Sequence, residues 1–176
     1  METPRPPRTL RSPGCAALVP DVAGPTHAYM RSAPGCWALF GELGITVTGS
    51  GGELYVDAFA AQHPGGARTD RRQRQSVAVH LVALCLVLDL GLTWPPLEVV
   101  RGRTGRLALP AGADWPYLEP PRFEGRLAVA DLVPAVAGDP VRGAAVRRWA
   151  EDVWDAWSDH HRTVRPWAAA VRAGVS

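Results

Sequence analysis

Histidine and cysteine side chains are the residues of this chain with the clearest capacity for chemistry. His27 and Cys36 lie in the stretch Gly24–Trp37, where Pro25 and Pro34 restrict the backbone. Imidazole nitrogens and thiolates bind transition metals, and imidazole also exchanges protons near neutral pH. Because loops held by turns and aromatic residues often carry functional sites, this stretch is a candidate for metal ligands or acid/base groups.

Our first hypothesis is a metal site inside a helical bundle. Its predicted ligands are His63, His80 and His160, with Cys36 or Asp57 completing the set. Histidines on different helices can converge on one ion, and two or three protein ligands leave a position for water or substrate. The expected cofactor is zinc or iron, and the expected reaction is metal-dependent chemistry on a small molecule. No two histidines have the short His-x-x-x-His spacing of the strongest zinc motifs.

Two other functions fit the same residues. In the first, Cys36 is a catalytic thiol activated by His27 or His63 without a metal; in the metal hypothesis above, His27 would be a base or would hydrogen-bond a ligand. A position in the first turn of a helix would favour the Cys36 thiolate. In the second, the chain is a non-catalytic interaction or structural domain whose histidines are scattered and satisfied by ordinary partners.

The segment Ser12-Pro13-Gly14-Cys15 has the shape of half a metal knuckle. A knuckle with two cysteines supplies two soft ligands from one turn, but here Ser12 occupies the place of the first cysteine. Serine is a poor substitute, so we interpret this segment as a tight structural turn.

The elements that must position these residues are mainly helices. Apolar periodicity and the placement of Pro and Gly predict helices at residues 34–43, 53–62, 71–90 and 139–164. Residues 93–121 are irregular, and Leu127–Val136 is either a short helix or a strand with a turn. The prediction is a mainly α, single-domain bundle of four or five helices with irregular Pro/Gly-rich connections.

Each candidate ligand has a predicted place on these helices. Asp57 points partly inward, and His63 ends its helix because Pro64 follows it. His80 lies on the apolar stripe of the central helix, a position where a lone histidine is usually a core residue with one hydrogen-bond partner. His160 lies on the inward stripe of the last helix, which also carries Trp157.

The amino-acid composition limits the classes of function that the chain can have. The chain has 176 residues, 47% of them hydrophobic, as expected of a globular domain at residues 12–173 after a disordered Pro/Arg-rich arm at residues 1–11. A net charge of +2 does not indicate nucleic-acid binding, and all 19 basic residues are arginine, which excludes a Schiff-base or P-loop lysine. Three sparse cysteines do not indicate a disulfide framework, and neither a secretory signal nor a membrane span is evident, so we expect a cytoplasmic protein.

The order of the motifs resembles an uncharacterised bacterial domain family of unknown function. The family carries Cys-Pro-x-Cys, Gly-Pro-Thr-His-x-Tyr-Met, Ser-Pro-Gly-Cys-Trp, a Gln-His-Pro segment, Gln-Ser-Val-x-Val-His-Leu and Trp-x-x-Trp-Ser-x-His-His. Matching segments here are Gly24–Met30, Pro34–Trp37, Val56–Gly65, Gln75–Leu81 and Trp154–His161. The resemblance implies no established activity. The chain departs from it at Ser12, where the family often has cysteine, which puts a four-ligand structural zinc site in doubt.

Overall fold

The computed structural model of the chain describes residues 8–47, 52–93, 103–104, 108–109, 113–136 and 142–174. Most of these residues are helical, which confirms the predicted mainly α fold. The described α-helices are α1 (Pro34–Thr46), α2 (Tyr55–Gln62), α3 (Arg71–Leu88), α5 (Val129–Val136), α6 (Arg142–Ala156) and α7 (His161–Ala173). Short 3-10 helices, η1 (Gly52–Leu54) and η2 (Ser158–His160), precede α2 and α7.

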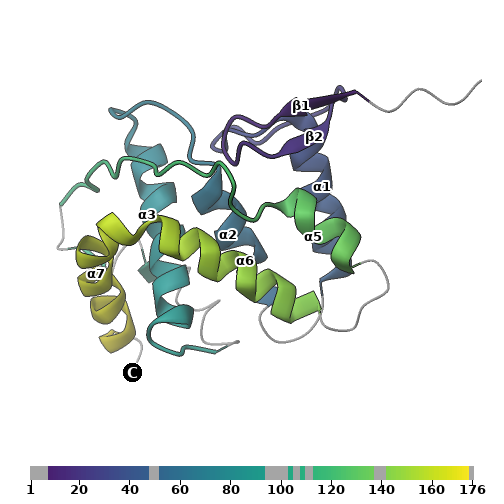
Figure 1. Cartoon of the computed structure of the whole chain (residues 1–176). Helices are drawn as coiled ribbons and strands as arrows, with labels where there is room; N and C mark the ends of the chain where they lie inside the picture. Colours follow the sequence, from purple (N-terminus) through teal and green to yellow (C-terminus); the bar gives the residue numbers. More distant parts are fainter. Residues whose placement is uncertain are drawn as a thin grey trace, which may run out of the picture.

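The helices pack around α2 and α6 (Figure 1). α3 contacts α2 and α7, α1 contacts α5, and α6 crosses α2. The extended segment 113–128, which we call the strap, passes over α3 and α2 before it enters α5. It is tied to α3 where the Arg74 guanidinium donates to the carbonyl of Trp115 at 2.7 Å.

A small hairpin covers the start of α1. Strands β1 (Thr9–Arg11) and β2 (Leu18–Pro20) pair antiparallel, with Leu10 opposite Val19. We expected residues 1–11 to be disordered, but Thr9–Arg11 form a strand because their backbone groups find partners on β2. The remainder of that arm, residues 1–7, lies outside the described residues.

Aromatic rings join α1 to α2. α1 begins at Pro34, as predicted, because proline suits the first helical position. Its Phe40 ring lies 4.3 Å from the ring of Phe59 on α2, and Trp37 approaches the same ring at 5.8 Å, centroid to centroid. Phe59 is fully buried, so this contact fixes α1 against the centre of the domain.

The central helix α3 agrees with its prediction. The Asp70 carboxylate caps its start by accepting the N–H of Arg72 at 2.9 Å. Leu81 and Leu84 on the predicted apolar stripe are fully buried. The helix ends at Leu88, and Gly91 then adopts a φ of +66°, which glycine tolerates without strain.

The predicted C-terminal helix at residues 139–164 is wrong as one continuous element. Its expected start at Asp139 and Pro140 lies outside the described residues, and the chain turns at η2 between α6 and α7. The turn allows α6 and α7 both to contact α3, so Val164 and Val171 of α7 become buried. Pro166 lies inside α7 and does not end it. This division contributes to the count of six described α-helices instead of four or five.

Three tryptophans, two on α6 and one directly after it, belong to the core. The indole N–H groups of Trp149, Trp154 and Trp157 each donate at 3.1 Å, to the Gln62 amide oxygen, the Asp89 carboxylate and the Ala61 carbonyl respectively. Buried indoles that find such partners fix helix orientation as well as filling volume. The bonds from Trp149 and Trp157 therefore hold α6 against the last residues of α2, directly before His63.

Replacing Gln62 by leucine is expected to lower the free energy of unfolding by about 2 kcal/mol, because the buried Trp149 N–H loses its acceptor. The Leu127 carbonyl, which accepts from the Gln62 amide at 2.7 Å, loses its donor as well. Denaturant unfolding measures the change. Gln75→Leu on the less buried face of α3 is the control, with an expected change below ~0.5 kcal/mol. Equal effects of the two substitutions would contradict the assigned role of Gln62.

Among the described residues, no helix is both long enough and apolar enough to cross a membrane.

Candidate metal centre

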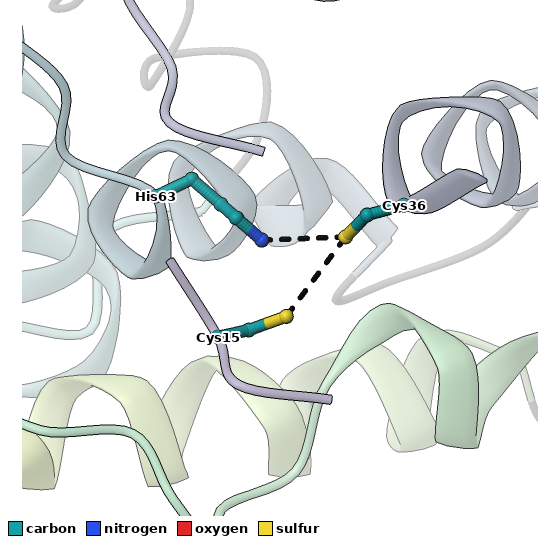
Figure 2. Close-up of side chains that lie close together, drawn as sticks. All are labelled: Cys15, Cys36 and His63. Carbon is teal, nitrogen blue, oxygen red and sulfur yellow. Dashed lines mark hydrogen bonds between the residues drawn. The ribbon is translucent and has the colours of Figure 1, made fainter. Parts of the chain in front are cut away.

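Three metal-ligating side chains meet in the interior of the protein (Figure 2). Cys36 Sγ lies 3.9 Å from Cys15 Sγ and 3.3 Å from His63 Nε2. All three ligand atoms lie within 4.8 Å of one another. The side chains are buried, with exposed fractions of 1% or less. We call this group the Cys/Cys/His cluster.

Three separate elements supply the cluster. Cys15 lies in the turn between β1 and β2, Cys36 lies in the first turn of α1, and His63 caps the C-terminus of α2. The chain holds the three elements together through backbone contacts as well. The N–H of Arg31 donates to the carbonyl of His63 at 2.9 Å, and Met30 and Pro64 form an isolated β-bridge.

The ring of His63 is oriented for metal binding. Its Nδ1 lies 2.8 Å from the carbonyl oxygen of Phe59, which can only accept, so Nδ1 carries the proton. Nε2 therefore directs its lone pair toward Cys36 and Cys15. A backbone carbonyl bound to the distal ring nitrogen is the usual way in which proteins fix the tautomer of a metal-ligating histidine. The ring also stacks on Phe59, with centroids 4.0 Å apart.

Two glycines allow the elements to approach so closely. A Cβ at Gly14 would lie 2.5 Å from Cδ2 of the His63 ring and 2.8 Å from the carbonyl oxygen of Arg31. A Cβ at Gly35 would clash with the carbonyl of Pro20 on β2. Glycine at these positions thus brings the hairpin turn onto His63 and the start of α1 onto the hairpin.

Ser12 is the fourth residue at this centre. It is buried, its hydroxyl accepts the N–H of Ala33 at 3.2 Å, and its side chain acts to lower the pKa of Cys36 against the larger opposing effects of Cys15 and burial. Its backbone closes the turn, since its N–H donates to Ala17 and its carbonyl accepts from Ala16, both at 2.9 Å. Ser12 therefore occupies the side of the cluster where a first knuckle cysteine would stand.

The two thiols of the cluster differ in acidity. The hydrogen bond from Cys36 lowers the pKa of Cys15 to about 4 against the opposing effect of burial. The same bond, together with burial, raises the pKa of Cys36. The contact between the two sulfur atoms therefore shifts the pKa values of the two thiols in opposite directions. The thiolate predicted at Cys36 is opposed by its contact with Cys15 and by burial, both of which raise the pKa of Cys36.

The other predicted ligands lie outside this cluster. His80 and Asp57 pair with each other, Nδ1 to Oδ1 at 2.8 Å, and the Asp57 side chain is fully buried. His160 donates from Nε2 to the Glu119 carbonyl at 2.9 Å. Of the predicted metal set, the structure brings together only Cys36 and His63 in a group of three or more ligands within its described part.

His27, the predicted catalytic base, lies apart from the Cys36 thiol. Its Nδ1 accepts the N–H of Tyr29 at 3.2 Å, and its ring contacts those of Tyr29 and Trp37 at 5.7 and 5.4 Å. The imidazole that does contact Cys36 is His63, the other partner considered for that thiol.

Cys15 is the member of the cluster that the sequence did not predict as a ligand. Its signal was the spacing Ser-Pro-Gly-Cys, which we interpreted as structural because the first cysteine is missing. The structure joins this half-knuckle to Cys36 and His63, so a full knuckle is not needed to assemble three ligands.

Comparison with known proteins gives a family but no function. A family model described as "Family of unknown function (DUF5946)" matches residues 11–158, which include all three cluster residues and Ser12. The match confirms the resemblance to an uncharacterised family. No curated protein and no solved structure matches the chain.

Proposed function

We propose that the chain, which belongs to the DUF5946 family of unknown function, binds one zinc ion through Cys15, Cys36 and His63. The ion would hold the hairpin, α1 and α2 together. The observation that carries the proposal is the convergence of three buried ligand atoms within 4.8 Å of one another.

The distances support a tetrahedral ion. Two sulfur ligands, each about 2.3 Å from a tetrahedral zinc, lie about 3.8 Å apart. The two Sγ atoms here are 3.9 Å apart, so an ion could enter with little movement of the chain. Thiolate and imidazole ligands in this number favour zinc over hard cations such as magnesium.

Burial supports a structural role for the ion. Catalytic zinc sites leave a position open to substrate, whereas all three ligands here are shielded from solvent. Three strong protein ligands leave one coordination position, and the Ser12 hydroxyl or a single water would fill it. An ion in this place stabilises the fold whether the domain is an enzyme or an interaction module.

Metal content tests the proposal. Untagged protein, purified without chelator, is expected to contain about one zinc ion per chain by inductively coupled plasma mass spectrometry. Cobalt substitution should produce sulfur-to-cobalt charge-transfer absorption. A protein that contains no metal, and whose thermal unfolding does not respond to added zinc, would rule the proposal out.

A metal-free dithiol is the second candidate. The 3.9 Å separation of the two Sγ atoms and the lowered pKa of Cys15 favour it. In that case, titration of the native, metal-free protein with an oxidised dithiol reagent should join Cys15 to Cys36 in a disulfide. The burial of both sulfur atoms disfavours this candidate, because a reagent or substrate must reach them.

Replacing Ser12 by cysteine is expected to slow zinc release to a chromophoric chelator by at least about tenfold, because a fourth thiolate would complete the coordination. Ser32→Cys is the matched control, since Ser32 is also buried but lies outside the cluster. Release that is as fast from Ser12→Cys as from the parent chain would show that residue 12 does not face the ion.

A further inference from the structure

A groove runs along the strap, beside the metal centre. Two cavities, of about 270 and 100 Å³, share Arg31, Pro64, Tyr117 and Pro120 as lining residues, so they adjoin one another. We call the two together the strap groove. One end reaches Pro13 and Gly14 of the hairpin turn, and the other reaches Gln73, Arg74 and Val77 of α3.

The lining of the strap groove combines polar and apolar surface in similar amounts, and prolines and aromatic rings form much of its apolar part. Prolines line both of its sides, and the ring of Tyr117 adds a flat aromatic surface. Leu118 and Phe123, both buried, form part of its base. Prolines and aromatic rings lose little conformational entropy when a ligand binds, so a planar apolar body would fit here at small cost.

Arg31, an exposed residue, is the arginine of the groove that pairs with no carboxylate among the described residues. Arg74, by contrast, pairs with Asp114 and also donates to the carbonyls of Trp115 and Arg68. At the rim, Arg68 pairs with Glu119 at 3.5 Å and lies over the Tyr117 ring at 4.4 Å. Within the described residues, the Arg31 guanidinium has no carboxylate or carbonyl partner, although its side chain lines both cavities.

The charges of the groove select a singly charged anion. An unpaired guanidinium offers two parallel N–H donors, the geometry that a carboxylate accepts. Glu119, although it pairs with Arg68, also lines the groove, and its carboxylate would repel a doubly charged phosphate more than a singly charged carboxylate. The hydroxyl of Tyr117 has no partner among the described side chains and adds a polar group to the wall.

We propose that the strap groove is a binding site for a small aromatic carboxylate, with the carboxylate on Arg31 and the ring against Tyr117 and the prolines. This inference goes beyond the metal site, because no cluster residue lines the groove. The two sites are nevertheless neighbours: Gly14 and Pro64, which line the groove, adjoin Cys15 and His63 in the chain.

Benzoate and benzamide are the probes that test this site on the metal-loaded chain of 176 residues. They have the same ring, but only benzoate is charged. Titration of nitrogen-15-labelled protein should give saturable shifts of the Gly65, Gly66 and Tyr117 amides with benzoate. Benzamide should bind at least about tenfold more weakly, since it lacks the charge-assisted bonds to the guanidinium.

Arg31→Met should weaken benzoate binding by about tenfold or more, whereas Arg148→Met, an exposed arginine on α6, should not. Thermal unfolding and zinc content verify that each variant is folded.

Three results would each overturn the proposal: no saturable binding of benzoate, equal binding of benzamide, or unaltered binding of benzoate by folded Arg31→Met. The benzamide comparison uses the parent chain and so holds even if Arg31→Met fails to fold. Because metal content is measured separately, a metal-loaded chain that does not bind benzoate refutes the groove site alone.

Discussion

Cys36→Ser is expected to abolish stoichiometric zinc binding and to lower the free energy of unfolding by about 4 kcal/mol or more. Cys36 is the central member of the cluster, since its Sγ contacts both Cys15 and His63. The variant would keep Cys15 in the hairpin turn and His63 at the end of α2, but it would lose the ligand on α1. Because a structural ion binds only the folded chain, its binding energy is also folding energy.

Cys85→Ser is the matched control for this experiment. Cys85 is also buried, but it lies on α3 outside the cluster, near Asp89, and burial raises the pKa of its thiol to about 12. Zinc content by mass spectrometry and thermal unfolding with and without added zinc would be compared for both variants. The assignment fails if Cys36→Ser retains one zinc per chain, or if both variants lose zinc equally.

Gly14→Ala is expected to destabilise the protein by about 3 kcal/mol and to weaken zinc binding. A methyl group at residue 14 would meet the ring carbon Cδ2 of His63 at 2.5 Å and the His63 Cα at 2.9 Å. The carbonyl oxygen of Arg31 would lie 2.8 Å from the same methyl group, so the methyl group has no free space on that side either. The hairpin turn must therefore move away from α2, which would carry Cys15 away from His63.

Gly41→Ala separates this steric effect from the general effect of replacing glycine. A Cβ at Gly41 would meet no atom within 4 Å, and the residue lies inside α1. Alanine there should stabilise the chain by about 0.5–1 kcal/mol, since glycine is unfavourable within a helix. Denaturant unfolding and chelator competition would be measured on both variants. Similar unfolding midpoints for Gly14→Ala and Gly41→Ala would be incompatible with the close approach of the hairpin turn to His63.

Local sequence patterns predicted most of the helices because their causes are local. Pro34 marks the start of α1, Asp70 caps α3, and His63 precedes Pro64 at the end of α2. The hairpin was not predictable in this way, since β1 and β2 have three residues each and are stabilised by each other. The division between α6 and α7 was also missed, because it follows from packing against α3.

The sequence by itself determined which residues could bind a metal and that His63 and Cys36 would stand at helix ends. Only the tertiary structure decided which of them meet. Cys15 and His63 lie 21 and 27 residues from Cys36, and their approach depends on Gly14 and Gly35, which let backbones pack without side chains between them. His80 instead hydrogen-bonds Asp57, which lies 23 residues away and was itself predicted as a ligand of the same ion. Helical periodicity specifies the face on which a side chain lies, whereas the partner on that face is set by how the elements pack.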